Sequence, residues 1–216
     1  MWAIATLFYA LDYFLHTAPN VLITPISQTL HASTPSLVGS TMGIYFPIYA
    51  LFQLPAGYLL DRFGLKIPLT LAAFTVGAGL WVTTWATIPA LYAGRALTAI
   101  GSSFAFLGAL KTAAIWLPSS RIGLAAGLTN SVGTVLGGAI LGLPILNLLI
   151  NQKNSNWQDA LFIMACAAFI LSAVILLLLR SKKTPTSTLS SSKSLLMKPI
   201  NKTQIFHTII LALYAG

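Results

Sequence analysis

Four long stretches of the chain contain no charged residue, and they limit the possible folds more than any other feature. They lie between Asp12 and Asp61, from Ile67 to Gly94, from Ile122 to Gln152 and from Ala160 to Leu179. A helix of about 20 apolar residues spans the hydrocarbon core of a bilayer. Each stretch is therefore long enough for one membrane crossing, and the first is long enough for two.

The composition of the whole chain agrees with a membrane protein. Hydrophobic residues make up 56% of the 216 residues and charged residues only 7%. In a soluble domain, about a quarter of the residues are charged. Transmembrane β-barrels show short alternating segments rather than long apolar runs. The sequence therefore predicts an all-α, polytopic transmembrane helix bundle.

Hydropathy and clusters of Gly, Pro, Ser and Asn divide the chain into six helices and a basic tail. The predicted helices occupy residues 2–28, 37–60, 67–86, 89–116, 122–149 and 157–180. We expect a six-helix transmembrane bundle over residues 1–180, followed by a cytoplasmic basic linker over 181–202 that is rich in Ser, Thr and Lys. Residues 203–216 begin another apolar helix that is too short to span, so we interpret them as a truncated start of a seventh helix.

The basic residues gather on one side of the predicted bundle. Most of the 12 Lys and Arg residues fall in the loops after the second, fourth and sixth helices, at Arg62, Lys66, Arg121, Arg180, Lys182, Lys183, Lys193, Lys198 and Lys202. The opposite loops contain only Lys153. The positive-inside rule then predicts a multi-pass protein of the cell membrane, with the amino terminus and the loop after the sixth helix in the cytoplasm. Because the basic residues are spread thinly and no recognition motif accompanies them, we expect no nucleic-acid partner.

Residues that could support catalysis or metal binding are few and scattered. The chain has one Cys, three His and three acidic residues, and no motif links them into a nucleophile, a base or a ligand cluster. We therefore expect neither an enzyme nor a metal site nor a cofactor.

The segment GYLLDRFGLK joins the second and third predicted helices and resembles the loop signature of the major facilitator superfamily. The matching residues are Gly57, Asp61, Arg62, Gly64 and Lys66. The second trailing base of the signature is missing, because Ile67 stands in its place. In that family the loop works as a conformational latch between two halves, and the resemblance implies this role for these five residues. A plain charged turn that fixes orientation is the alternative. We also expect Gly57 to permit a close helix contact and Gly64 to permit a tight turn.

A second resemblance extends from Leu91 to Gly138. The segment LYAGRALTAIGSS around Arg95 is similar to the fourth-helix signature of the same family. The fifth helix lacks the Gly-Pro pair of the antiporter signature, which argues against drug:proton antiport. It carries small residues at four-residue spacing, which permit close helix packing, at Gly123, Gly127, Gly133, Gly137, Gly138 and Gly142. The resemblance covers nearly the whole chain and implies the amino-terminal half of a twelve-helix major facilitator fold, truncated in helix 7.

Five polar residues inside the predicted helices are candidates for a substrate path: Asp12, His16, Asn20, Arg95 and Lys111. The first three share one face of the first helix, and the other two lie on the fourth. Ionisable groups inside a membrane usually face a cavity or a partner. From depth along the helices alone, we pair Asp12 with Lys111, and Arg95 with Asn20 or His16.

The resemblance implies that the first and fourth helices line a central cavity, and the positive balance of these residues favours a small anionic solute. We expect transport by alternating access, with proton-coupled symport through His16 or Asp12. The expected partners are the lipid bilayer, the solute, protons and a carboxy-terminal transporter half. Some alternatives remain open: Arg95 as a structural ion pair or a clamp on a backbone carbonyl, and Lys111 reaching towards the membrane interface. The whole chain could also be a non-transporting remnant or a sensor-like membrane protein.

Overall fold

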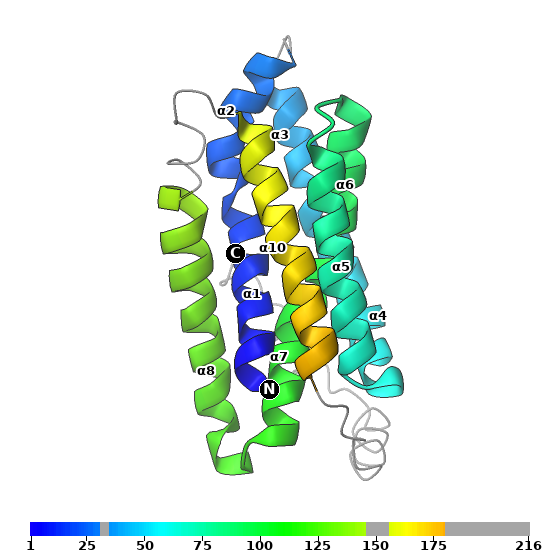
Figure 1. The fold of residues 1–216 in the computed structure, drawn as a ribbon, viewed down its shortest axis with the longest axis vertical. Coiled ribbons are helices and arrows are strands. Elements are labelled where there is room, and N and C mark those ends of the chain that lie inside the picture. The colour runs from blue at the N-terminus through cyan, green and yellow to red at the C-terminus, as the bar shows by residue number, and fades with distance from the viewer. Residues whose placement is uncertain (31–34, 146–155, 180–216) are drawn as a thin grey trace, which may run out of the picture. The chain divides into compact units, whose positions relative to one another are not determined.

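The computed structural model describes residues 1–30, 35–145 and 156–179 (Figure 1). All regular secondary structure in these residues is helical. The predicted linker at 181–202 and the predicted start of a seventh helix at 203–216 lie outside the described residues.

The first predicted helix is present as two consecutive segments, α1 (Trp2–Thr17) and α2 (Pro19–Thr29). The backbone at Ala18 between them is still helical, with φ −52° and ψ −37°. Pro19 has no N–H group and cannot continue the ladder of backbone hydrogen bonds. The predicted range of residues 2–28 is therefore helical, but it is interrupted where this proline stands.

The other predicted helices each correspond to an observed helix or to a consecutive pair. These are α3 (Pro35–Gly43) with α4 (Tyr45–Phe63), α5 (Lys66–Thr83), α6 (Ile88–Ser102) with α7 (Ala105–Trp116), α8 (Ile122–Val132) with the π-helix η2 (Gly133–Ile145), and α10 (Trp157–Leu178). A short 3-10 turn, η1 (Ser119–Arg121), precedes α8.

Five spans of the described residues are long and apolar enough to cross a membrane. They are Val38–Phe63, Lys66–Thr83, Ile88–Trp116, Ser119–Ile140 and Trp157–Leu178. The segments α1 and α2, with 16 and 11 residues, are each shorter than these spans. Large apolar side chains also point outwards, such as Leu54, which is 84% exposed, and Leu177, which is 79% exposed. The predicted all-α transmembrane bundle is confirmed.

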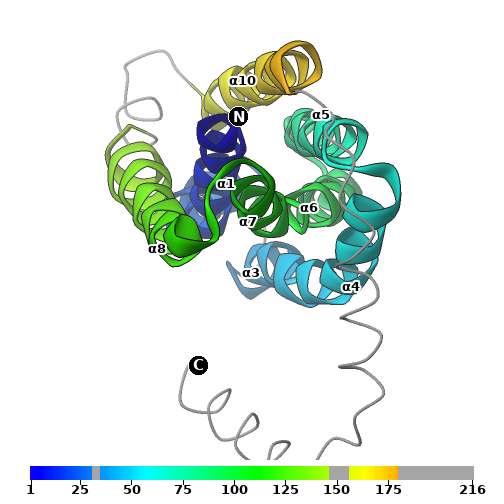
Figure 2. The same cartoon turned by 90° about the horizontal axis from the view of Figure 1, so that it is seen from below.

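Two tight packing arrangements hold the bundle together. In one, α5 lies between α6 and α10, and in the other, α1 packs against α7 and η2 (Figure 2). Glycines let the α5 and α6 backbones approach, because a Cβ on Gly94 would meet the Gly79 carbonyl oxygen and Thr83. This contact fixes α6, which carries Arg95, against α5.

The glycines of η2 lie against α1. A Cβ on Gly137 would meet the Ala10 carbonyl oxygen and the Phe14 amide nitrogen, and the neighbouring glycines face α1 side chains: Gly133 faces Tyr9, Gly138 faces Tyr13 and Gly142 faces Thr17. Gly123 and Gly127 have open space where a Cβ would stand. The expected packing role therefore does not hold at Gly123 and Gly127 among the described residues, because both lie on the side of α8 opposite to its buried residues Ala125 and Thr129.

Side-chain hydrogen bonds reinforce the position of α1. The Trp2 indole donates to the Thr129 hydroxyl at 3.0 Å, and the Tyr9 hydroxyl donates to the Asn130 side-chain oxygen at 3.1 Å. Both acceptors lie on α8. One side of α1 is therefore held by the glycine contacts with η2 and by the hydrogen bonds with α8.

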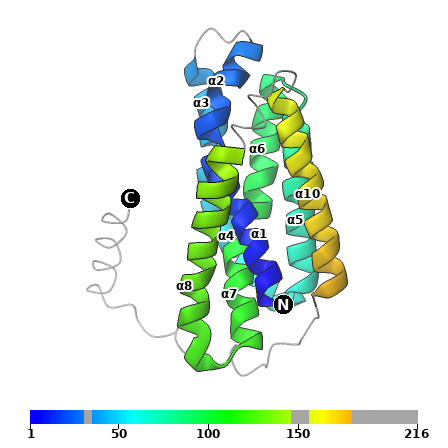
Figure 3. The ribbon, with the colours of Figure 1, turned by 60° about the vertical axis from the view of Figure 1, so that its left-hand side comes forward.

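One end of the bundle collects the basic turns. Met1, the α4–α5 turn and the turn between α7 and α8 lie at the same end, opposite the end where α2 stops (Figures 1 and 3). Arg62 and Lys66 belong to the first of these turns and Arg121 to the second. Alternating helix directions therefore bring together basic residues that are far apart in the sequence.

Candidate functional site

A buried carboxylate links the first and second predicted helices. Asp12 on α1 is 1% exposed, and its Oδ1 accepts a hydrogen bond from the Tyr45 hydroxyl at 2.7 Å. Tyr45 is the first residue of α4 and is itself fully buried. Breaking this bond would leave a buried polar group without a partner, which is costly. The bond therefore ties α4 to α1 in the interior of the bundle.

His16 lies one helical turn beyond Asp12 and reaches the surface. Its Nε2 is 3.5 Å from Asp12 Oδ1, and 27% of its side chain is exposed. Aromatic rings surround the imidazole, with ring centres 5.1 Å away at Tyr45, 5.7 Å at Phe46 and 5.4 Å at Tyr49. Of the contacting side chains of Asp12, His16 and Tyr45, only His16 is thus accessible from outside the bundle.

Arg95 lies behind this aromatic layer. Its side chain is buried, and both Nη atoms donate to the Leu15 carbonyl oxygen at 3.4 Å, beyond the usual length of such bonds. Its Cζ lies 4.7 Å from the centre of the Tyr45 ring, in cation–π contact. The clamp on a backbone carbonyl, which the sequence left open, is thus present. Among the described residues, the ion pairs are Asp12–His16 and Asp61–Lys111, so neither engages Arg95.

The same region contains buried polar atoms with unused hydrogen-bonding capacity. Within the described residues, Asp12 Oδ2, His16 Nε2, Arg95 Nε and Ser102 Oγ have no hydrogen-bonding partner of ordinary geometry. Ser102 nevertheless approaches the side chains of Asp12 and Tyr45. Buried polar groups are normally satisfied, and a cluster of exceptions needs a reason. Chemically, this cluster can bind a water molecule or a polar group of a solute.

Lys111 does not lie with Asp12, His16 and Arg95 but beside the α4–α5 turn. Its Nζ lies 2.7 Å from Asp61 Oδ1 and donates to the Gly57 carbonyl oxygen at 2.8 Å. The predicted pairing of Asp12 with Lys111 is therefore wrong. Helical rise gives the depth of a residue but not the direction of its side chain, and Lys111 on α7 points towards α4 rather than α1. Asn20 is exposed on α2.

The α4–α5 turn has the geometry that its glycine permits. Gly64 has φ 75° and ψ −175°, a conformation essentially restricted to glycine. Beside it, the Arg62 guanidinium donates to the Tyr58 hydroxyl at 2.9 Å. Gly57 has open space where a Cβ would stand, so the expected close helix contact is absent there. Its role in the structure is to offer its carbonyl oxygen to Lys111.

The structure brings Asp12, His16 and Arg95 together, but it joins Lys111 to the turn residues instead. Sequence reasoning missed Ser102 and the contact between Tyr45 and Asp12. A usable signal existed for Ser102, because it follows Arg95 by seven residues and so shares its face of α6. For Tyr45, no spacing within one helix could indicate a partner on another helix.

Comparison with known proteins gives a consistent result. The sequence matches the Major Facilitator Superfamily over residues 2–216. It is 31% identical to the uncharacterized transporter YybO of Bacillus subtilis over 72% of this chain and 35% of that protein. It is 26% identical to a putative tartrate transporter of Agrobacterium vitis over 91% of this chain and 47% of that protein. It is 27% identical to the probable sulfoacetate transporter SauU of Cupriavidus necator over 73% of this chain and 37% of that protein.

The chain spans less than half the length of these relatives. All three carry transporter names, which supports the prediction of a transport protein rather than an enzyme. The family match covers nearly every residue, including the GYLLDRFGLK turn and the helices that carry Asp12 and Arg95. This multi-pass helical membrane protein belongs to the major facilitator superfamily.

Proposed function

We propose that this bundle is one half of a secondary transporter that moves a small organic anion by alternating access. Relatives that are named as tartrate and sulfoacetate transporters support an anionic solute, since both compounds are organic acids. Alternating access needs two halves that rock around a site near the middle of the membrane. We therefore assign a complementary helical half as the partner of this bundle.

The observation that carries the proposal is the buried Arg95 guanidinium, which lies between α6 and α1 with no ion pair to a carboxylate in the described residues. A cation in a medium of low dielectric constant exerts a strong field on its surroundings. The solute binds at the surface formed by His16, Phe46 and Tyr49, and Arg95 attracts its negative charge from behind Tyr45. Asn20, exposed one turn beyond His16, belongs to the same path.

Uptake of labelled organic anions into proteoliposomes tests this proposal, with the complete transporter containing this bundle and its complementary half. Arg95→Gln should lower anion uptake at least about tenfold, because the positive charge is lost, while Arg95→Lys keeps the charge and should retain a larger share. Arg121→Gln, at an exposed turn, is the matched control. If uptake is the same in Arg95→Gln and Arg121→Gln, the assignment of the anion site is wrong.

The contact between His16 and Asp12 supports proton coupling. Imidazole and carboxylate are groups that can exchange a proton, and the two lie one turn apart with Nε2 and Oδ1 at 3.5 Å. Solute entry should then raise the external pH in a weakly buffered suspension of wild-type proteoliposomes. His16→Gln should abolish that change. An unaltered pH rise in His16→Gln would remove His16 from the coupling mechanism.

The latch role of the α4–α5 turn rests on the contact between Asp61 and Lys111. This bond joins the turn to α7, and it is exposed enough to break and reform as the halves move. Gly57 and Gly64 provide the carbonyl oxygen and the tight turn, and Arg62 and Lys66 anchor the turn at the membrane surface. The latch therefore acts on conformation, whereas the Arg95 region acts on the solute.

The basic end of the bundle is the cytoplasmic end, and the membrane is the cell membrane. Arg62, Lys66 and Arg121 at that end support this orientation through the positive-inside rule. Single cysteines introduced at Ser120 and at Thr87, on opposite ends, test it in intact cells after Cys166 is replaced by Ser. An impermeant reagent should label Thr87→Cys and spare Ser120→Cys. The reverse labelling would overturn the orientation.

A further inference from the structure

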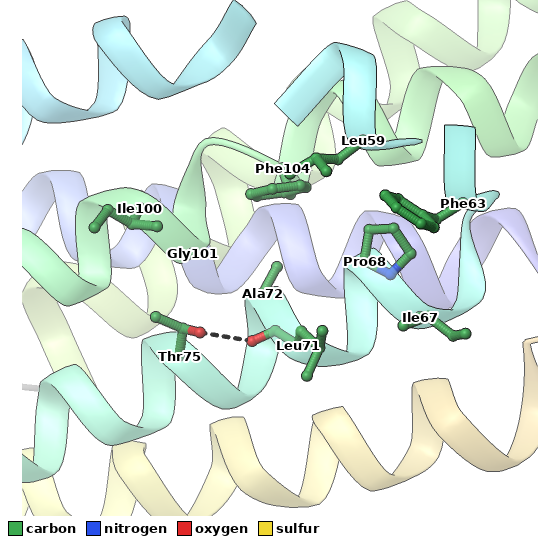
Figure 4. A pocket seen from close by; sticks show the side chains of 10 residues that line it. All are labelled: Leu59, Phe63, Ile67, Pro68, Leu71, Ala72, Thr75, Ile100, Gly101 and Phe104. Carbon is green, nitrogen blue, oxygen red and sulfur yellow. Dashed lines mark hydrogen bonds between the residues drawn. The ribbon is translucent and has the colours of Figure 1, made fainter. Parts of the chain in front are cut away.

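An apolar groove of about 360 Å³ opens beside the α4–α5 turn, away from the Arg95 region. It runs between α4, α5 and the junction of α6 with α7 (Figure 4). Ala72, Gly101 and Phe104 are buried and form its floor. Ile67 and Leu71, which are 57% and 60% exposed, stand at its rim. The groove is therefore open to the surroundings of the bundle.

The groove exists because helices meet closely beneath it. A Cβ on Gly101 would meet the Ala72 carbonyl oxygen and Val76, so the α5 and α6 backbones are in contact at this point. Small residues at the floor leave space between the larger side chains on either side. In the membrane this space must be filled, since empty cavities cost the contacts that their walls would otherwise make.

The lining accepts hydrocarbon and needs no hydrogen bond from an occupant. Thr75 alone among the lining residues carries a hydroxyl, and that hydroxyl donates to the Leu71 carbonyl oxygen at 2.8 Å. The remaining side chains of the lining are apolar. An extended alkyl chain matches this surface better than any polar molecule.

Two basic residues stand next to residues that line the groove, and neither forms an ion pair with an acidic side chain among the described residues. Lys66 and Arg62 are the chain neighbours of Ile67 and Phe63, which line the groove. The nearby acid, Asp61, is engaged by Lys111 at 2.7 Å. In addition, α5 begins without a side-chain cap and without an acid in its first turn, so its positive end adds to the charge.

The charge and the groove together define the shape of the occupant. Ile67 and Thr75 are separated by eight positions of α5, or about 12 Å of helix. A molecule that fits both parts has an anionic head at the basic turn and an apolar tail that follows α5 into the membrane. We propose that the groove binds one acyl chain of an anionic phospholipid, whose phosphate is held by Lys66 and Arg62.

Native mass spectrometry of the complete transporter in mild detergent tests this site. Phosphatidylglycerol and phosphatidylcholine with identical acyl chains serve as probes. Phosphatidylglycerol should bind more tightly, and Lys66→Gln should weaken its binding about fivefold, as one basic residue near a charged membrane surface does. Arg121→Gln should change nothing, because Arg121 carries the same positive charge but has no chain neighbour that lines the groove.

Thr75→Phe fills the groove from its inner end and should abolish binding of both lipids at this site. The melting temperature of Thr75→Phe shows whether this variant folds. If it does not fold, the comparison of Lys66→Gln with Arg121→Gln tests the lipid site by itself. Equal binding of the two lipids, or equal loss in Lys66→Gln and Arg121→Gln, would overturn the proposal. A disulfide formed between Leu71→Cys and a cysteine on the complementary half would also overturn it, since protein would then cover the groove.

Discussion

The two charged clusters of the bundle differ in exposure and in how completely their hydrogen bonds are satisfied. Asp12 and Arg95 are 1% and 4% exposed, and each retains a polar atom without a partner. The side chains of Asp61 and Lys111 are 50% and 28% exposed, and Lys111 has two short contacts. Burying unsatisfied polar groups is costly, so such a cluster indicates binding, whereas an exposed pair can break cheaply and suits a switch.

The largest effect should come from disturbing the helix that carries the buried cluster. Gly137→Leu places a side chain where the Ala10 carbonyl oxygen and the Phe14 amide stand, so α1 must move away from η2. We expect a loss of about 3 kcal/mol or more, measured as the midpoint of unfolding in detergent. Gly127→Leu is the control, because no neighbouring helix of the described residues comes within 4 Å of its Cβ position. Equal destabilisation by both changes would contradict the close approach of α1 and η2.

Removing the Tyr45 hydroxyl should cost less, but more than the same change at the exposed turn. Tyr45→Phe loses a 2.7 Å bond to the buried Asp12 carboxylate, and we expect about 1.5–3 kcal/mol of destabilisation. Tyr58→Phe removes an exposed hydroxyl that accepts from Arg62, and we expect less than about 0.5 kcal/mol. Thermal unfolding of both variants measures the difference. If Tyr58→Phe is as destabilising as Tyr45→Phe, the buried hydrogen bond contributes no more to stability than the exposed one.

The turn at Gly64 should show an intermediate effect. Any other residue at φ 75° and ψ −175° is strained by about 1–3 kcal/mol, so Gly64→Ala should lower the melting temperature. Gly57→Ala, in the interior of α4 with open space around it, should be neutral or slightly stabilising. A neutral Gly64→Ala would mean that the turn adopts another conformation.

The smallest effect concerns the exposed pair. A double-mutant cycle of Asp61→Asn and Lys111→Gln should give a coupling free energy of less than about 1 kcal/mol, because solvent screens partly exposed charges. Chemical unfolding of the two single variants and the double variant measures it. A coupling of about 3 kcal/mol would place the pair in the same class as the buried cluster.

The helical segments could be predicted because a membrane leaves the chain few choices. Long uncharged stretches must satisfy their backbone groups internally, and this condition alone indicates where helices lie. Interruptions inside those helices were harder to predict. Pro19 was a visible cue for the break between α1 and α2, and the Gly and Ser residues at 101–103 were a weaker one for the junction of α6 with α7, but nothing marked the widening of α8 into a π-helix at Gly133.

The candidate site could be predicted only within one helix. The contact between Asp12 and His16 follows from a spacing of four residues on α1. Partners on different helices depend on how each helix is rotated about its axis, which depth along the membrane does not fix. Lys111 was therefore paired with the wrong acid, and the link between Asp12 and Tyr45 was missed.

Solute binding measured apart from transport tests most directly whether the two clusters have separate roles. Calorimetric titration of the complete transporter with its organic anion should show a dissociation constant raised at least about tenfold by Arg95→Gln and unchanged by Lys111→Gln. Lys111→Gln should instead alter the rate of uptake. An unchanged dissociation constant in Arg95→Gln, together with a raised one in Lys111→Gln, would contradict the assignment of solute binding to the Arg95 region and of conformational control to the exposed pair.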